Sequence, residues 1–381
     1  RLGRGINLGN ALEAPSEGAW GITLEESYFQ LIKEKGFSSV RIPVRWYTAA
    51  RTDTNPPYTI TPEFLSRVQW AVDNELKNGV CAIINQHHYE PLYETPEAEK
   101  QKFLALWEQI ADHFKGYSDS LAFEILNEPH GNLSAALWNP LCADALSVIR
   151  ETNPDRTVMI GIAEYGGIGG LSKLQLPDDT NLILTVHYYN PFHFTHQGAS
   201  WVDGADAWLG TAWGGSYYEK VAVINEFGAV RDFAGQHNIP VNVGEFGAYS
   251  KADMHSRALW TEYCARLFES YGYSWHYWEF CSGFGIYNPG NGTFNNELVD
   301  ALLSGDTTIL ILEKEEIKGN DILVNGDFSS GMDTWEMNDW DGAADVVVES
   351  GEACITVQTN STDSWGIQFQ QTGISLAAGQ K

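Results

Sequence analysis

Two hydrophobic patterns alternate along most of this chain. Short apolar runs rich in β-branched residues are separated by longer stretches in which apolar residues recur every three or four positions. The first pattern is typical of buried strands and the second of amphipathic helices. Eight strands are predicted, at residues 5–10, 39–44, 80–88, 121–129, 157–164, 182–190, 240–248 and 273–280. Helices are predicted between them, at residues 24–35, 62–78, 98–114, 134–151, 217–237 and 254–271.

Strands that alternate with helices predict an α/β fold with a parallel sheet. Eight such units before residue 306 favour a closed (β/α)8 TIM barrel over an open sheet. Between the fifth and sixth strands the helical pattern is weak and rich in glycine. That connection is therefore the least regular part of the predicted barrel.

The pattern changes after Asp306. A charged stretch at 309–320 is followed by short β-like pieces at 322–324, 344–348, 354–357 and 366–370, with turn residues between them. These pieces are typical of an all-β sandwich, but about 60 residues would leave its sheet edges and one core face uncovered. We therefore predict a barrel at 1–306, a linker at 307–320 and a truncated β-sandwich at 321–381.

Charge and composition narrow the possible partners. The net charge of −27 disfavours nucleic acid and anionic membranes, and it suits a secreted protein that meets neutral polymers. The sequence contains no run of 18 apolar residues, so no membrane span is predicted. The five cysteines are scattered and are expected to be mostly buried thiols. The 14 Trp and 17 Tyr suit either a large aromatic core or a groove that stacks on sugars. The chain begins abruptly before its first strand, which suggests that an N-terminal segment has been removed.

Candidate chemistry gathers at the carboxyl ends of the predicted strands. Polar or ionisable residues lie there on most strands: Arg41, Arg45, His87, His88, Asn127, Glu128, His187, Tyr188, Tyr189, Glu245, Trp278 and Glu279. A barrel brings these ends to one mouth, where its active site lies. Buried strands have no structural need for so many costly polar groups.

Two carboxyls stand out among these residues. Glu128 follows Asn127 at the end of an apolar run that closes with Ile125-Leu126. Glu245 lies between Gly244 and Phe246-Gly247. Glycoside hydrolysis needs two carboxyls in different environments. The alternative is that each merely caps a helix or pairs with an arginine. Because histidines and a tyrosine lie on neighbouring strand ends, the pair favours a catalytic site.

Two other patterns suggest chemistry less convincingly. Glu226, in Asn225-Glu226-Phe227-Gly228, repeats part of both motifs, but the apolar spacing around it predicts a solvated position on an outer helix. His193 and His196 have possible ligand spacing, but no cysteine or acidic partner lies close by. His87 and His88 are adjacent on a strand, so their side chains point to opposite faces. We expect no metal and no cofactor.

Six strings resemble glycoside hydrolase family 5, in order and in spacing: 4–10, 40–43, 84–88, 125–129, 187–189 and 244–247. The resemblance covers nearly all of residues 1–306. It implies a retaining barrel enzyme with Glu128 as acid/base and Glu245 as nucleophile. It also implies that Arg41 supports the nucleophile, that Asn127 contacts the 2-hydroxyl, and that Trp278 is a sugar platform. The expected substrate-binding residues are Asn10, Glu13, Trp20, Arg41, His87, His88, Asn127, His187, Tyr189, Trp201 and Trp278.

Further strings place the chain nearer to one branch of that family. Residues 12–15 with Trp20, and residues 277–285, are similar to bacterial members that cut β-glucans and often mannan or glucomannan. Asn325-Gly326-Asp327-Phe328, Trp335 and residues 365–374 resemble the N-terminal half of a carbohydrate-binding module of families 4 and 9. The resemblance therefore implies a monomeric endo-β-1,4-glycanase that acts on a polysaccharide.

Other functions remain open from the sequence. The barrel could bind glycans without cutting them, or it could be a dedicated β-mannanase or xyloglucanase. An aldolase is disfavoured because no predicted strand ends in the lysine that such chemistry usually needs. Retaining enzymes hold their two carboxyls about 5–5.5 Å apart, whereas inverting enzymes keep them farther apart. The separation of Glu128 and Glu245 is therefore the geometric test.

Overall fold

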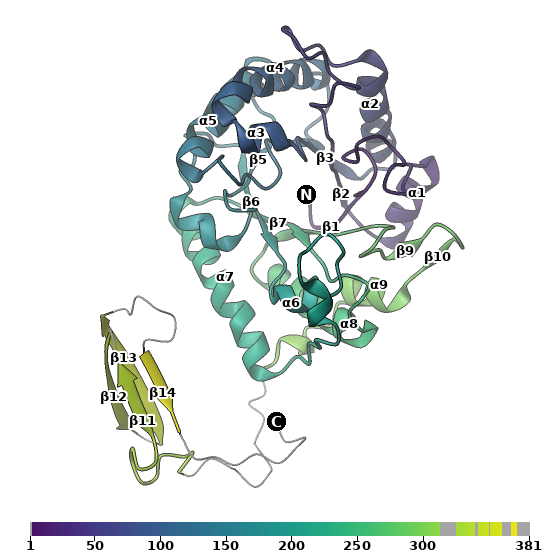
Figure 1. The fold of residues 1–381 in the computed structure, drawn as a ribbon. Helices are drawn as coiled ribbons and strands as arrows, with labels where there is room; N and C mark the ends of the chain where they lie inside the picture. The colour runs from purple at the N-terminus through teal and green to yellow at the C-terminus, as the bar shows by residue number, and fades with distance from the viewer. Residues whose placement is uncertain (1, 313–324, 340–341, 350, 360–366, 372–381) are drawn as a thin grey trace. The chain divides into compact units, whose positions relative to one another are not determined.

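The computed structural model describes residues 2–312, 325–339, 342–349, 351–359 and 367–371 (Figure 1). The chain divides into two compact units, Arg1–Glu313 and Lys314–Lys381. The predicted linker at 307–320 falls partly outside the described residues. Its described part, residues 307–312, belongs to the first unit and contains a short 3₁₀ turn, η3 (Thr308–Leu310).

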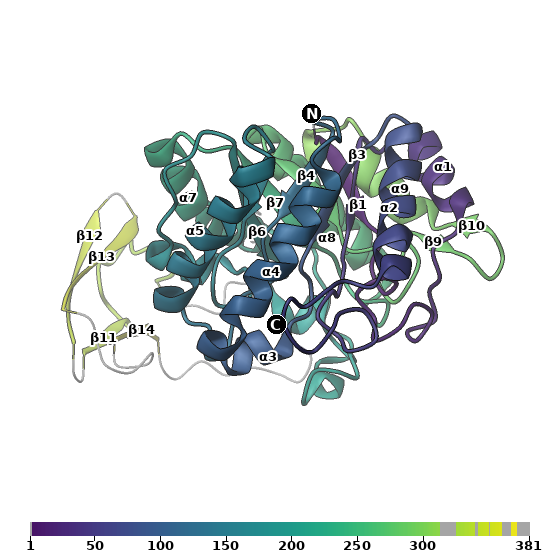
Figure 2. The same cartoon turned by 90° about the horizontal axis from the view of Figure 1, so that it is seen from above.

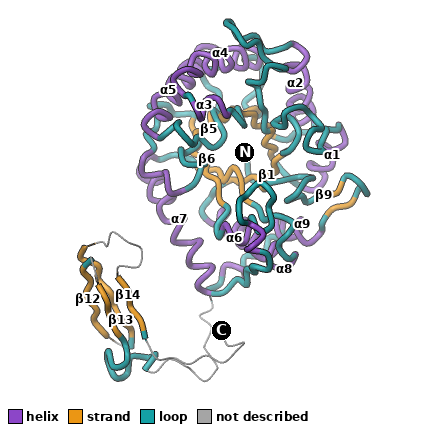
Figure 3. The backbone as a smooth tube through the Cα atoms, in the orientation of Figure 1, coloured by secondary structure: helices purple, strands orange, loops and turns teal. Residues whose placement is uncertain are grey.

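The first unit is a closed barrel of eight parallel strands, as predicted. The strands form the central ring in Figures 1 and 3, and the helices surround it. Their bounds are β1 Arg4–Asn7, β2 Ser39–Ile42, β3 Cys81–Asn85, β4 Leu121–Glu124, β5 Val158–Ile160, β6 Leu182–Tyr188, β7 Val241–Phe246 and β8 Ser274–Tyr277. The ring closes where β1 pairs in parallel with β8.

The helices of the barrel lie where the 3.6-residue pattern predicted them. Their bounds are α1 Glu26–Lys35, α2 Pro62–Lys77, α4 Pro96–Phe114, α5 Ala135–Thr152, α7 Tyr217–His237 and α8 Met254–Ser270. Figure 2 shows them along the outside of the strands. The weak, glycine-rich connection between β5 and β6 forms only the 3₁₀ helix η1 (Ile168–Lys173).

Short elements escaped the sequence analysis. They are α3 (Glu90–Glu94), α6 (Phe192–Thr195), η2 (Ala205–Trp208), α9 (Asn296–Leu303) and the small hairpin of β9 (Tyr287–Asn288) and β10 (Thr293–Phe294). One or two turns carry too few apolar positions to show a period. α9 is the one of these elements with a readable helical signal: the Asn295 side chain caps its first turn, and Leu298, Val299 and Leu302 are buried at helical spacing.

A polar layer lies inside the barrel among otherwise apolar side chains. The His276 ring lies 2.9 Å from Ser39 Oγ through Nε2, and its Nδ1 faces the Asn242 side chain. Burial lowers the pKa of His276 to about 3, so the ring is neutral. Gly5 makes room for it, because a Cβ there would lie 2.3 Å from the ring. Satisfied polar groups of this kind hold the strands in register at modest cost.

The second unit contains four strands in its described residues. They are β11 (Glu336–Asp339), β12 (Ala343–Glu349), β13 (Glu352–Thr359) and β14 (Ile367–Gln370). β11 pairs with β14 and β12 pairs with β13, both antiparallel. The predicted strands at 344–348 and 354–357 lie within β12 and β13. The predicted piece at 322–324 lies outside the described residues. Three rings gather in this unit: Phe369 stacks on both Phe328 and Trp335, which are tilted against each other.

The remaining features agree with the sequence except at Glu226. All five cysteines are free thiols: three are buried, Cys81 is half-buried and Cys354 is exposed. Among the described helices, none is long and apolar enough to cross a membrane. Glu226 lies on α7 as predicted, but it is half-buried and accepts a hydrogen bond from Asn190 Nδ2 at 3.0 Å. The expectation of a solvated carboxylate was therefore wrong, because Asn190, which follows β6, reaches this face of the helix.

Candidate active site

The two predicted catalytic carboxyls face each other at the carboxyl ends of the strands. Glu128 follows β4 with a φ of 45°, in the left-handed region that favours glycine. Glu245 lies on β7, where the pairing with β6 shifts by one residue between Val186 and His187. Gly244 is the extra residue of this bulge, and the shift sets Glu245 opposite His187. Oxygens of Glu128 and Glu245 lie within 4.8 Å of each other.

Arg41 on β2 is the centre of the network that holds the site. Its side chain is fully buried. Nη1 donates to Glu245 Oε1 at 2.7 Å and to Asn7 Oδ1 at 2.9 Å. Nη2 donates to Asn127 Oδ1 at 2.7 Å and to Glu124 Oε1 at 2.9 Å, while Nε donates to Glu124 Oε2. All five donors of the guanidinium fork are therefore used to orient groups at the mouth.

Opposing effects set the charge of Glu245. Burial alone would raise its pKa, but the charges of His187 and Arg41, with hydrogen bonds from Arg41 and Tyr189, hold the pKa below its usual range. Tyr189 donates to Glu245 Oε2 at 3.0 Å. The arrangement keeps Glu245 ionised.

His187 lies between the two carboxyls. Its Nδ1 is 2.8 Å from Glu128 Oε1 and 3.6 Å from Glu245 Oε2. Burial lowers the pKa of His187, but the negative charges of Glu245 and Glu128 outweigh it and raise the pKa above the usual value. Glu128, His187 and Glu245 together also have the spacing of a cation site. A cation there would have to share Glu245 oxygens that already accept from Arg41 and Tyr189.

A row of flat side chains extends from the carboxyl pair along one side of the mouth. The Trp278 ring is parallel to His87 at a centroid distance of 5.8 Å, and His87 meets His88 edge-on at 4.7 Å. Trp20 meets His88 edge-on at 5.6 Å and is 42% exposed. Burial lowers the pKa of His87 well below its usual value, so this ring is neutral. Such a row suits a chain of neutral sugars, whose apolar faces stack on rings.

The loop after β1 borders this row but turns its acidic side chain inward. A Cβ on Gly9 would lie 2.8 Å from the Trp278 indole, so the backbone touches the ring. Asn10 is half-buried with a φ of 65°. The Glu13 carboxyl is buried and accepts the backbone N–H groups of Asn10 and Ala11. Direct contact between Glu13 and substrate stays a prediction.

The loop after β6 carries the other predicted aromatic contact. Trp201 is 59% exposed and meets Tyr249 edge-on at 4.9 Å. His196 is buried between the rings of Phe192 and Tyr189, and His193 stacks on Trp208 at 4.2 Å. The two histidines that had possible ligand spacing are therefore packed in separate aromatic contacts.

The structure adds residues that the sequence analysis did not choose. Glu124 and Asn7 share Arg41 with Glu245. Their signal was present, since both are polar residues inside buried strands. His130 and Tyr165 form a stacked pair with centroids 4.2 Å apart, and Tyr165 is 60% exposed. The pair adjoins the acid/base loop, because Tyr165 N donates to Pro129 O. The feature that distinguishes Tyr165 is its own positive φ of 63° in a loop, and a backbone angle cannot be read from the sequence.

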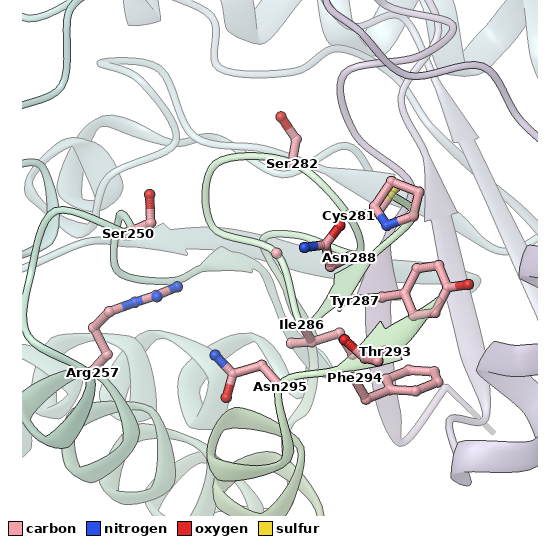
Figure 4. A pocket seen from close by; sticks show the side chains of 12 residues that line it. Ser250, Arg257, Cys281, Ser282, Ile286, Tyr287, Asn288, Thr293, Phe294 and Asn295 are labelled. Atoms are coloured by element: carbon pink, nitrogen blue, oxygen red, sulfur yellow. The ribbon is translucent and has the colours of Figure 1, made fainter. Parts of the chain in front are cut away.

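A separate cavity of about 500 Å³ lies behind the loop that follows β8 (Figure 4). Its lining includes Ser250, Arg257, Ser282, Asn288 and Asn295, but neither Glu128 nor Glu245. Arg257 is buried there and donates to the carbonyls of Ala248 and Phe284. The cavity is therefore distinct from the carboxyl pair and its row of rings.

Comparison with known proteins gives a consistent result. The profile of the family described as Cellulase (glycosyl hydrolase family 5) matches residues 5–283. Endoglucanase H of Acetivibrio thermocellus is 37% identical over 313 residues, which are 81% of this chain and 33% of that protein. Endoglucanase B of Ruminococcus albus is 33% identical over 68% of this chain and 66% of its own length. The chain thus spans about a third of the length of Endoglucanase H.

Solved structures agree with the sequence relatives. Cel5A of Thermotoga maritima is 50% identical, with a TM-score of 0.78 over 79% of this chain and 97% of that one. It has been solved with mannotriose and with cellobiose. A hyperthermophilic endo-β-1,4-glucanase in complex with substrate is 46% identical, with a TM-score of 0.78.

Proposed function

Because this chain belongs to glycosyl hydrolase family 5, the cellulase family, we propose that it hydrolyses internal β-1,4 linkages of glucan with retention of configuration. The observation that carries the proposal is the Glu128–Glu245 pair, whose oxygens lie within 4.8 Å with His187 between them. Two carboxyls at this spacing suit a covalent intermediate better than the wider gap that an inverting enzyme needs for its water.

The proposed reaction has two steps. In the first, Glu245 attacks the anomeric carbon while Glu128 gives its proton to the leaving oxygen, so the glycosidic bond breaks and a glycosyl ester forms. In the second, Glu128 takes a proton from water, which attacks the same carbon and releases Glu245. Arg41 and Tyr189 support the first step by keeping Glu245 ionised. The Asn127 oxygen accepts from Arg41, so its amide nitrogen is the donor left for the sugar 2-hydroxyl.

Neutral β-linked chains are the proposed substrate class. The row of Trp20, His88, His87 and Trp278 supports stacking, and the net charge of −27 disfavours anionic polymers. Mannan or glucomannan is a second proposed substrate, supported by the relative solved with both cellobiose and mannotriose. The two sugars differ at one hydroxyl, which a few hydrogen bonds distinguish. We also propose that the enzyme is a monomer that acts outside the cell, where such polymers occur.

The first test compares reducing-end release from carboxymethyl-cellulose and from β-mannan. Wild type is expected to cut glucan, and Glu245→Gln is expected to lose at least about 1,000-fold in kcat. Glu226→Gln is the matched control, because Glu226 lies on the outer helix α7, and it should keep wild-type activity. An active Glu245→Gln variant would reject the nucleophile assignment. If wild type binds both polymers but cuts neither, the barrel is a glycan-binding protein.

The stereochemistry tests the two-step reaction separately. Proton NMR during the first minutes of hydrolysis should show the β-anomer of the new reducing end before mutarotation. Early accumulation of the α-anomer would mean inversion and would rule out the covalent step.

We also propose that the second unit binds glycans. Its described residues include an aromatic stack of Phe328, Trp335 and Phe369. Adsorption of the whole chain to insoluble cellulose, compared with the Trp335→Ala variant, tests this. Equal adsorption by both proteins would contradict the proposal.

A further inference from the structure

The loop after β1, residues 9–14, is held from two sides. On its inner side the Glu13 carboxyl accepts the backbone N–H groups of Asn10 and Ala11. On its outer side the guanidinium of Arg51 donates to the carbonyls of Leu12 and Ala14, at 2.8 and 2.9 Å. These two carbonyls flank Glu13. The side-chain hydrogen bonds described for this turn come from one acidic and one basic residue, while the turn's own Ala11 and Leu12 side chains are packed in the hydrophobic core.

Arg51 is well built for this position. The residue is buried, with 5% of its surface exposed. Nη1 also donates to Arg45 O at 2.7 Å, which ties the β1 loop to the β2 loop. The guanidinium carbon lies 4.3 Å from the centre of the Phe64 ring. Three carbonyls and one ring face match a planar fork, which a lysine ammonium would not reproduce.

The electrostatics make the loop depend on Arg51. Burial and the nearby charge of Arg45 lower the pKa of Arg51 to about 10, so it stays charged at neutral pH. Burial raises the pKa of Glu13 to about 8, against the backbone hydrogen bonds that lower it. A carboxyl that is largely protonated at neutral pH accepts hydrogen bonds less strongly than a carboxylate. Of the two side chains that hold this loop, Arg51 is therefore the one that is charged at neutral pH.

The loop matters because it borders the row of rings. Gly9 touches the indole of Trp278, and Asn10 follows it with a left-handed φ. The reacting carboxyls are held separately, by Arg41, His187 and Tyr189. A change in the loop should therefore alter how the sugar chain is held and leave the chemical step nearly unchanged.

We propose that Arg51 is a positioning residue for substrate: it holds residues 9–14 against Trp278 and so sets the KM for the sugar chain. The effect on kcat is small. The inference rests on the proposed glycanase function for its kinetic consequence, but not for the shape of the loop.

The kinetic test uses Arg51→Gln and Arg51→Lys with Arg156→Gln as a matched control. Arg156 is also buried and also donates to backbone carbonyls, among them Leu121 O and Tyr117 O, but it precedes β5 at the opposite end of the barrel. On a soluble β-1,4-glucan we expect KM to rise about tenfold in Arg51→Gln and less in Arg51→Lys, with kcat within about threefold. Arg156→Gln should lower Tm and leave KM unchanged.

Two results would overturn the proposal. One is an unchanged KM in Arg51→Gln, and the other is an equal rise of KM in Arg156→Gln, which would mean that lost stability alone is responsible. If Arg51→Gln does not fold, the same comparison is made with Arg51→Lys.

Hydrogen exchange separates this inference from the proposed function. The amides of Asn10 and Ala11 should exchange at least about tenfold faster in Arg51→Gln than in wild type or Arg156→Gln. Unchanged protection would show that Arg51 does not hold the loop, whatever the enzyme cuts. If wild type does not hydrolyse glucan, the proposed function fails, and the exchange rates still decide the role of Arg51.

Discussion

At the scale of single residues, the site depends on where buried charge is compensated. Arg41 forms ion pairs with two carboxylates, Glu124 and Glu245, and all three residues are buried. A buried cation with satisfied donors is tolerated, whereas removal of one partner leaves an uncompensated charge. Because the fork also orients Asn127, a single residue controls both the charge of Glu245, the proposed nucleophile, and the direction of the Asn127 amide.

Arg41→Lys tests this control. A lysine keeps the positive charge but cannot serve five acceptors, so kcat should fall about 100-fold or more. The pKa of Glu245 is held down partly by Arg41, so it should rise in the variant and move the acidic limb of kcat/KM to higher pH. Arg67→Lys is the control, because Arg67 makes a similar two-pronged pair with Glu17 away from the carboxyls. A pH profile identical to wild type would contradict the argument.

Glu75 on α2 shows the opposite case, a buried carboxyl without compensation. Within the described parts of the chain neither of its oxygens has a hydrogen-bond partner, and burial raises the pKa of Glu75 well above its usual value. The folded state therefore holds a proton that the unfolded chain releases above about pH 4.5. Stability should be complete below that pH and fall as pH rises toward the folded pKa.

Urea unfolding of wild type and Glu75→Gln between pH 4 and 8 measures this. The variant cannot ionise, so its advantage over wild type should grow with pH, by up to about tenfold in the unfolding constant per pH unit. Glu63→Gln, at the exposed start of the same helix, should show no such trend. Parallel stability curves for wild type and Glu75→Gln would show that Glu75 is not buried as a neutral acid.

At the scale of elements, the carboxyl ends of the strands decide the chemistry. The predicted strands ran up to five residues too long there; β4 ends at Glu124, whereas the prediction reached 129. Beyond several of the ladders lie the polar residues of the mouth, among them His87, Asn127 and Glu128. The sequence shows which residues follow a strand, but the bulge that sets His187 opposite Glu245 arises from pairing between β6 and β7.

Gly244→Ala tests the bulge. An added Cβ would lie 2.5 Å from Thr185 Oγ1 and 3.2 Å from His187 Nε2, so His187 should be displaced from the carboxyls. We expect a loss of about tenfold or more in kcat at pH 7 together with a lower Tm. Gly228→Ala on α7, where nothing lies within 4 Å, should instead stabilise the protein by about 0.5–1 kcal/mol and keep activity. Full activity in Gly244→Ala would show that the bulge does not position His187.

At the scale of the whole molecule, the net charge of −27 repels any anionic polymer that approaches. Like charges repel over about 10 Å at 0.1 M salt, and added salt screens them. A neutral glucan does not feel this field, but carboxymethyl-cellulose is anionic. The choice of assay polymer therefore changes the apparent affinity.

Salt dependence measures the effect of this charge. Between about 10 and 200 mM NaCl, KM for carboxymethyl-cellulose should fall several-fold, while KM for a neutral soluble glucan stays constant. Turnover on the neutral polymer serves as the control for any general effect of salt on the enzyme. A KM for carboxymethyl-cellulose that does not depend on salt would mean that the acidic groups lie away from the path of the polymer.

The order of strands and helices, the barrel and the family were readable from the sequence alone. Hydrophobic periodicity reflects burial on one face of each element, and the motifs around Glu128 and Glu245 are local strings of a few residues. The shared partners of Arg41, the inward turn of Glu13, the half-burial of Glu226 and the clamp of Arg51 were decided only in the tertiary structure. The contacts of Arg41, Glu226 and Arg51 join residues on different loops, helices or strands, and no local pattern records which of them meet when the barrel closes.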